Sequence, residues 1–232
     1  DPVSQNSFDG AARDKGYDVL VMDGQLDTHF IGWFENKNQG TRFVRVDADV
    51  VDKLIEKENN LKMALSSAQQ DLLRPVFEAQ LPAEDKIRYT VSFEPMAENQ
   101  MPVMITQNEF MRRMKDMAAM GGSGMQFYGQ LPDNFNVVIN GNHPLVAEIL
   151  GEVEASYGDK LKTTNKKLDA AIAEQRSFEE LVKDKKAEDF SQEEKDKQQE
   201  VDKKVEDLRR QRTERLTEIG RENKLVKQVV DL

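Results

Sequence analysis

The clearest pattern along the chain is a strict alternation of apolar and polar residues over residues 86–94. Four apolar side chains share one face of this segment: Ile87, Tyr89, Val91 and Phe93. The alternation predicts a half-buried strand. Residues 101–105 predict a second short strand, which Pro102 places at a sheet edge or strand start because proline cannot donate a ladder hydrogen bond. Residues 135–139 alternate in the same way and predict a third strand.

The first sixty residues combine short apolar runs with an amphipathic segment. Residues 17–22 form a mostly apolar run that ends at Asp23 and Gly24, which predicts a buried strand, typical of a parallel sheet. Residues 27–34 place four apolar side chains within about two helical turns and predict a helix. Residues 41–46 alternate and predict another strand. A strand–helix–strand unit of this kind indicates a small layered α/β domain.

Helical periodicity dominates residues 47–80, where apolar side chains recur three, four and seven positions apart. Pro75 lies inside this pattern, and we expect a break or a new helix start there because proline lacks the N–H of a helix interior. The whole stretch is expected to link two subdomains.

Two further helix starts can be recognised from local chemistry. Thr106 and Glu109 have the spacing of a capping box, which predicts a helix over residues 107–120. Pro144 suits the first position of a helix over residues 145–150, because its fixed φ is already helical.

The last eighty residues follow a different pattern. Ser191 and Glu194 form a second capping box, ahead of a charged helix with sparse apolar positions. These positions are Val201, Val205, Leu208, Leu216 and Ile219. A long helical hairpin and a partly disordered insertion both fit such a segment. Gly220 breaks the pattern, and Asn223 is expected to cap a last helix.

Composition divides the chain at about residue 150. Charged residues number 40 among the last 82 residues but only 36 among the first 150, and eight of the ten methionines fall between Met96 and Met125.

The net charge of -10 argues against a nucleic-acid surface. No run approaches the roughly 20 apolar residues of a membrane span. The absence of cysteine excludes disulfides and fits a cytoplasmic location. Asp1 precedes no signal-peptide pattern, so an excised piece of a longer protein is expected.

Candidate catalytic or metal-binding residues are few. His29 and His143 are the only histidines, and neither stands in a zinc-binding spacing. Residues 121–124 are glycine-rich but lack the Lys-Ser/Thr pair of a phosphate-binding loop. We therefore expect no catalytic residue and no metal site.

The methionine cluster is a sharper feature. At helical spacing one face carries Phe110, Met114 and Met117, with Met111 and Met120 at its flanks. Methionine is unbranched and polarizable, so such a stripe can adapt to varied apolar partners, including unfolded chains and amphipathic segments. The competing interpretation is that the stripe is ordinary core.

Four segments, taken in order, resemble the ninety-kilodalton heat-shock chaperone family, most closely its bacterial HtpG type. They are Gly16-Tyr-Asp-Val-Leu-Val-Met22 with Leu26-Asp27, the stretch 101–120 with Glu109-Phe-Met-Arg-Arg-Met114, the stretch 134–149 with Asn142-His-Pro-Leu-Val146, and Leu225-Val-Lys-Gln-Val-Val-Asp-Leu232. The charged stretch of about 155–220 is longer than the connection usual in that family.

The resemblance implies an α+β fold class. Residues 1–60 would be a small three-layer α/β subdomain at the end of the middle domain, and residues 61–80 a linking helix. Residues 81–232 would form a truncated, dimerisation-type α+β C-terminal domain, with a long charged helical insertion at about 155–220.

The resemblance also implies a function, that of an ATP-dependent homodimeric chaperone acting on non-native client proteins. The ATP and Mg²⁺ of that family bind upstream of any segment found here, so this piece would hold no cofactor and have no ATPase activity. Client contact would map to Phe110, Met111, Met114, Met117 and Met120, and more loosely to Phe30 and Trp33. Dimerisation would map to Leu225, Val226, Val229, Val230 and Leu232, and would be weakened because the chain stops inside that element.

A second function class stays open from the sequence. The charged helices could form an intermolecular coiled coil in a non-enzymatic scaffold protein, although no clean heptad is sustained. Neither interpretation involves nucleic acid or a membrane.

Overall fold

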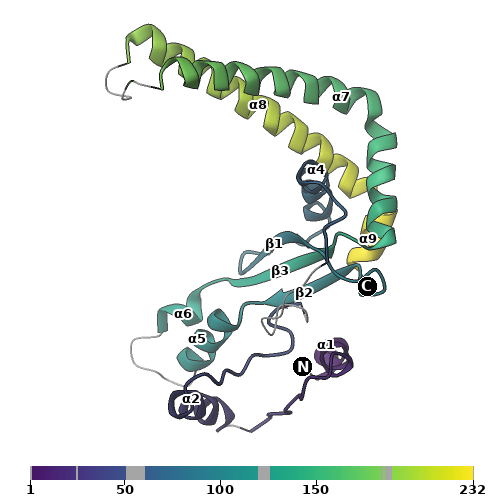
Figure 1. The fold of residues 1–232 in the computed structure, drawn as a ribbon, viewed down its shortest axis with the longest axis vertical. Coiled ribbons are helices and arrows are strands. Elements are labelled where there is room, and N and C mark those ends of the chain that lie inside the picture. Colours follow the sequence, from purple (N-terminus) through teal and green to yellow (C-terminus); the bar gives the residue numbers. More distant parts are fainter. Residues whose placement is uncertain are drawn as a thin grey trace. The chain divides into compact units, whose positions relative to one another are not determined.

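The structure of the chain is a computed structural model, which describes residues 2–24, 26–50, 61–119, 126–183, 185 and 190–231. The described residues form helices and one small three-stranded sheet, which confirms the α+β class (Figure 1). The chain forms two compact units, one made of Asp1–Ala64 and Pro82–His143, the other of Leu65–Leu81 and Pro144–Leu232. The domain limits that the family resemblance implies stay a prediction.

The sheet of the first unit contains the three strands predicted over residues 86–94, 101–105 and 135–139. They are β1 (Ile87–Glu94), β2 (Val103–Gln107) and β3 (Asp133–Asn140). The order is β1-β3-β2, with β3 parallel to β1 and antiparallel to β2. Strand β2 therefore lies at an edge, and Pro102 lies next to its first residue, as expected.

The middle strand supplies the core of this unit. Val137, Val138 and Ile139 are buried in succession, because β3 is covered on both faces. Val138 belongs to an apolar cluster with Val50 and Met96. The strand ends at buried Asn140, whose amide nitrogen donates to the carbonyl of Ala97 at 2.9 Å.

Two predicted strands near the N-terminus are wrong. Residues 17–22 lie between helices α1 (Pro2–Asp14) and α2 (Asp27–Lys37), and residues 41–46 follow α2. Neither segment has a strand partner among the described residues. A strand exists only when a neighbouring strand takes up its backbone hydrogen bonds, and apolar patterning alone cannot supply that neighbour. Within 17–22 the side chains of Leu20 and Val21 are strongly exposed.

The methionine-rich helix α5 (Glu109–Ala119) starts later than predicted. Thr106 does not cap it, because the pairing of β2 with β3 continues through Thr106 and Gln107. Asn108 takes that place: its side-chain oxygen accepts from the backbone N–H of Met111 at 3.2 Å. The short helix α6 (Gln126–Gln130) precedes β3.

In the second unit, α4 (Ser67–Glu78) occupies the last part of the predicted helical stretch 47–80; residues 51–60 lie outside the described residues. Ser66 caps α4 with a complete capping box. The predicted break at Pro75 is wrong, since Pro75 lies inside the helix. Proline has no N–H, so the carbonyl of Asp71, four residues earlier, lacks its helical donor. Asp71 is exposed, and water can bind this carbonyl instead. Leu73 and Val76 are buried on the opposite face of the helix.

A long antiparallel hairpin of two helices forms most of the second unit (Figure 1). Of the two interpretations of the charged segment, the helical hairpin is therefore the one that the structure shows, and not the partly disordered insertion. The hairpin joins α7 (Pro144–Leu181) to α8 (Gln192–Glu222). Pro144 begins α7 as predicted, but the expected end at residue 150 is wrong, because α7 continues through Gly151 to Leu181. Ser191 caps α8 with the predicted capping box. The apolar positions of the hairpin close on each other within this chain: Leu168, Ala171, Ile172, Val205 and Leu208.

The end of α8 contacts α4, and the expectation that Gly220 breaks the helix is wrong. A Cβ built on Gly220 would lie 2.2 Å from the carbonyl oxygen of Val76, so the absence of a side chain allows the two helices to approach. Asn223 caps α9 (Lys224–Val230) as predicted, with its side-chain oxygen accepting from the N–H of Val226 at 2.8 Å.

Candidate functional site

Helix α5 exposes its apolar stripe instead of burying it. Phe110 keeps 59% and Met117 40% of its accessible surface, and Met111 and Met114 are half-buried. The interpretation of the stripe as ordinary core is therefore wrong for Phe110 and Met117. Met120 lies outside the described residues.

Four of the five charged side chains of α5 are more covered than Phe110 and Met117, whereas Asp116 keeps 41% of its side-chain surface. Among the residues of α5, Glu109 is buried. The side chains of Arg112, Arg113 and Lys115 are 22%, 25% and 21% exposed. An ordinary amphipathic surface helix shows the opposite arrangement, with its charges in water and its apolar face inward. The charged face of α5 is therefore its contact face.

These charges meet residues 35–47, which end α2 and follow it. Arg113 contacts Glu35 at 2.7 Å and Glu109 at 2.7 Å, and its guanidinium also donates to the carbonyl of Phe43 at 2.6 Å. Arg113 also donates to the other carboxylate oxygen of Glu35 at 3.2 Å, and that oxygen accepts from the backbone N–H of Phe43 at 2.7 Å. Arg113 thus joins one side chain of α2, one backbone carbonyl and one side chain of its own helix.

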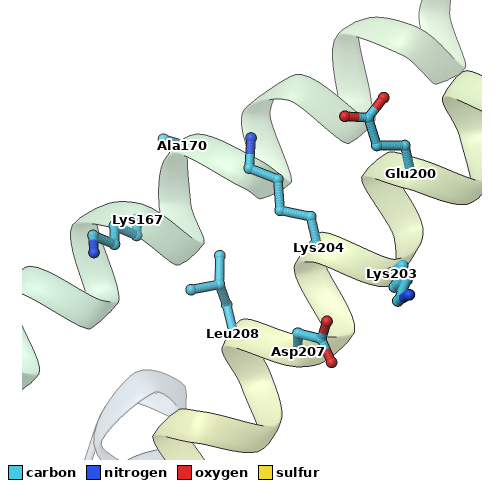
Figure 2. A pocket seen from close by; sticks show the side chains of 7 residues that line it. All are labelled: Lys167, Ala170, Glu200, Lys203, Lys204, Asp207 and Leu208. Atoms are coloured by element: carbon cyan, nitrogen blue, oxygen red, sulfur yellow. The ribbon is translucent and has the colours of Figure 1, made fainter.

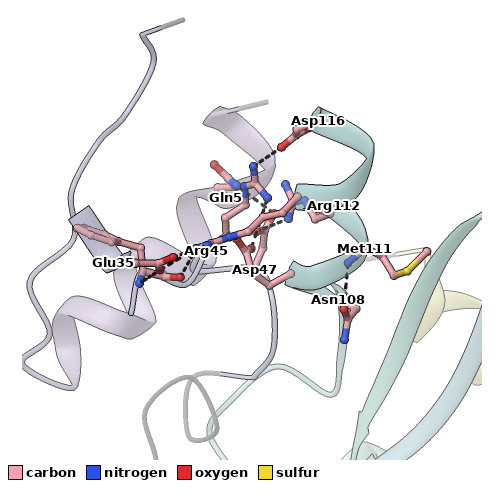
Figure 3. Close-up of polar contacts among 11 residues, drawn as sticks. Gln5, Glu35, Arg45, Asp47, Asn108, Met111, Arg112 and Asp116 are labelled. Carbon is pink, nitrogen blue, oxygen red and sulfur yellow. Dashed lines mark hydrogen bonds and ion pairs between the residues drawn. The ribbon is translucent and has the colours of Figure 1, made fainter. Parts of the chain in front are cut away.

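A second set of contacts lies beside the first (Figure 3). Arg112 pairs with Asp47 at 2.6 Å, and Gln5 donates to the other oxygen of Asp47 at 3.0 Å. Arg45 pairs with two residues of α5, Asp116 at 2.6 Å and Glu109 at 3.4 Å. We call these seven charged residues the α5 charge cluster: Glu35, Arg45, Asp47, Glu109, Arg112, Arg113 and Asp116.

Electrostatics within the cluster favour the ionised forms. The hydrogen bond from Arg113 holds the pKa of Glu35 below its usual value, with partial burial acting against it. The same hydrogen bond raises the pKa of Arg113 above its already high value. Both groups are therefore charged throughout the neutral range.

Helix α2 carries the second predicted set of contact residues. Phe30 is 44% and Trp33 56% exposed. Their rings lie 6.2 Å apart, Phe34 stands 5.6 Å from Phe30, and the Lys37 ammonium lies 5.0 Å from the Trp33 ring. Such aromatic pairs and a cation over an indole hold the rings in place while leaving their outer surfaces open.

An exposed apolar segment near the N-terminus escaped the sequence-based site prediction. Leu20 and Val21 are 66% and 86% exposed, and Leu26 is exposed as well. Apolar patterning could not identify them as surface residues, because the same run of side chains is typical of a buried strand.

The predicted dimerisation residues lie on and around α9. Val226 and Val229 are buried in this chain, whereas Leu225 and Val230 are partly exposed. Leu232 lies outside the described residues.

The hairpin offers one shallow groove between α7 and α8, shown in Figure 2. Its walls are mostly charged: Lys167, Ala170, Glu200, Lys203, Lys204, Asp207 and Leu208. Across the hairpin Lys204 pairs with Glu174 at 2.8 Å, which lowers the pKa of that carboxyl and raises the pKa of the lysine. Both groups are exposed, so this surface is a solvated helix pair.

Within the described part of the chain, no three His, Cys, Asp or Glu side chains lie together in a way that could hold a metal ion. In the same residues no helix is both long enough and apolar enough to cross a bilayer. His29 lies on α2 and His143 in the turn between β3 and α7.

Comparison with known proteins identifies the family. No family model and no solved structure matches the chain. Curated proteins do match. The chain is 39% identical to the chaperone protein HtpG of Bacteroides thetaiotaomicron over 98% of its own length and 33% of that protein. It is 37% identical to HtpG of Porphyromonas gingivalis over 100% of its own length and 34% of that protein.

The chain therefore belongs to the ninety-kilodalton heat-shock chaperone family, in its bacterial HtpG type. It spans about a third of the length of the curated relatives that it matches. The match extends over the α7–α8 hairpin, so the charged segment that seemed unusual for the family has a counterpart in these relatives.

Proposed function

We propose that this chain provides a client-binding surface of an HtpG-type chaperone, and that α5 is its centre. The observation that carries the proposal is the inverted exposure of α5, whose charged side chains are engaged while Phe110 and Met117 face solvent. Exposed methionine and phenylalanine suit binding of non-native chains, since flexible apolar side chains adapt to unrelated sequences. Phe30 and Trp33 on α2 would add aromatic contacts.

The proposed chemistry is binding, without bond making or breaking in this part of the protein. In the family, hydrolysis of ATP with Mg²⁺ belongs to the whole chaperone. No step proposed for this part of the protein uses nucleotide. Self-association through Leu225, Val230 and their neighbours on α9 belongs to the same proposal.

A suppression assay tests the client-binding role. Thermally unfolding citrate synthase would be mixed with the chain, and aggregation followed by light scattering. The triple variant Phe110→Ser, Met114→Ser, Met117→Ser should need at least tenfold more protein for half-suppression, since even one such side chain buried against a client contributes roughly 1.5 kcal/mol, or about tenfold in affinity. Circular dichroism would establish that the variant keeps its helical content.

A matched control distinguishes α5 from exposed apolar surface in general. The triple variant Leu20→Ser, Val21→Ser, Leu26→Ser removes three exposed apolar side chains from the same unit. It should suppress aggregation as the unmodified chain does. Full suppression by the α5 variant, or equal losses in both variants, would refute α5 as the binding centre.

The coiled-coil scaffold is not favoured. Its apolar positions, among them Val205 and Leu208, already contact α7 inside this chain. An intermolecular coiled coil through those positions would have to open the hairpin first.

A further inference from the structure

Helix α5 needs external support to exist. It has 11 residues, and isolated helices shorter than about 12–15 residues are marginal in water. Most short surface helices obtain their stability by burying an apolar face. The apolar face of α5 is instead partly open, and the residue that it buries is Glu109. Helix α5 also contacts α6, and polar contacts supply the attachment on its charged face.

The α5 charge cluster has the properties of a strong polar attachment. Three arginines face four carboxylates, and the contacts of Arg113 with Glu35 and Glu109, of Arg112 with Asp47 and of Arg45 with Asp116 are all 2.6–2.7 Å long. Charge-assisted hydrogen bonds of this length are stronger than neutral ones. Single exposed ion pairs contribute little, but a partly buried network whose members share partners contributes more than its separate pairs.

The backbone reinforces the same attachment. The N–H of Gln107, just before α5, donates to the carbonyl of Asp47 at 3.1 Å, and Arg113 binds the carbonyl of Phe43. Residues 43–47 are thus tied both to the start of α5 and to its middle.

We propose that Arg112 and Arg113 are positioning residues that anchor α5 by its charged face to residues 35–47, so that Phe110 and Met117 stay turned toward solvent. An unanchored amphipathic helix would lower its free energy by turning its apolar face onto the protein and its charges into water. The anchor opposes that rotation. The importance of this anchor for client binding rests on the proposed function. The anchoring of α5 itself does not depend on that function.

Hydrogen exchange measured by mass spectrometry on the full chain tests the anchor directly. Arg113→Met keeps an unbranched apolar stem in place of the arginine stem and removes the guanidinium with its charge and its donors. It should accelerate exchange of the α5 amides about tenfold or more, because the contacts with Glu35, Glu109 and the Phe43 carbonyl are lost. Amides of β3 should keep their protection, which shows that the fold persists. Arg210→Met, which removes an exposed arginine paired with Asp207 on α8, is the matched control and should leave α5 unchanged.

A double-variant cycle tests the pairing itself. If Arg113 acts through Glu35, then Glu35→Gln should accelerate α5 exchange, and adding it to Arg113→Met should have little further effect. Raising the ionic strength to about 1 M, where the Debye length is about 3 Å, should also accelerate exchange in α5 more than in β3. Unchanged α5 exchange in Arg113→Met, or fully additive effects in the double variant, would overturn the anchor.

These outcomes are separable from those of the suppression assay. The serine variant of the apolar stripe lowers client suppression under the proposed function and keeps all the anchor contacts. Failure of that variant to change suppression refutes the function and leaves the anchor standing. Normal exchange in Arg113→Met refutes the anchor and leaves client binding by α5 standing.

Discussion

Replacement of Gly220 by alanine is the most quantitative test of how the second unit is assembled. A Cβ at residue 220 would lie 2.2 Å from the carbonyl oxygen of Val76, 2.8 Å from its Cα and 2.8 Å from the Cβ of Ala79. Two of these three atoms are backbone, so no side-chain rotation relieves the clash. Helix α4 would have to move away from α8 by about 1 Å to reach ordinary contact distance.

That movement opposes a favourable local effect. Alanine inside a helix is more stable than glycine by about 1 kcal/mol, because it loses less backbone entropy on folding. Overpacking of a close contact costs about 1–3 kcal/mol, more where the backbone must shift. The bond in which the Gln80 amide donates to the carbonyl of Gly220, 2.6 Å long, would also be strained. We expect Gly220→Ala to lower the free energy of unfolding by about 2 kcal/mol.

The assay is urea unfolding followed by circular dichroism, with Gly151→Ala as the matched control. Gly151 lies inside α7 and is exposed, and a Cβ built there meets no atom within 4 Å. The control should therefore gain about 0.5–1 kcal/mol from helix propensity alone. If Gly220→Ala were as stable as Gly151→Ala, the close approach of α4 and α8 would be refuted.

Three further substitutions or conditions probe other parts of the chain. Asn223→Ala should lower stability by about 1 kcal/mol in thermal unfolding, since α9 loses its cap and the residue also loses its contact with Glu152; an unchanged midpoint would contradict the cap. Lys204→Met should change the free energy of unfolding by no more than about 0.5 kcal/mol, because its partner is exposed, and a larger loss would show that this pair matters more than its setting indicates. Acidification should destabilise the unmodified chain more than Glu35→Gln: the pKa of Glu35 is lowered on folding, so its contribution is present above the ordinary value of 4.5 and is lost as the pH falls through the folded-state pKa. Parallel pH curves for the two proteins would refute a role for this ion pair.

The sequence by itself determined the elements whose signals are local. Alternation identified β1 and β3, because a side-chain period of two needs no knowledge of the rest of the fold. Ser191 and Asn223 were recognised as caps, since a capping side chain bonds to a backbone N–H only three residues away. The family could be recognised from short segments in the correct order, and the curated relatives confirm it.

Only the tertiary structure decided what lies opposite each face. Residues 17–22 have the composition of a buried strand but no strand beside them among the described residues. From the sequence, Gly220 suggests the end of a helix; the structure shows that it lies inside α8 and allows α4 to approach closely. From the sequence, the charges of α5 suggest a solvated face; in the structure, Arg112 and Arg113 pair with Asp47 and Glu35. Periodicity reports which side chains share a face, whereas burial depends on partners far away in the chain, and those partners follow from the fold alone.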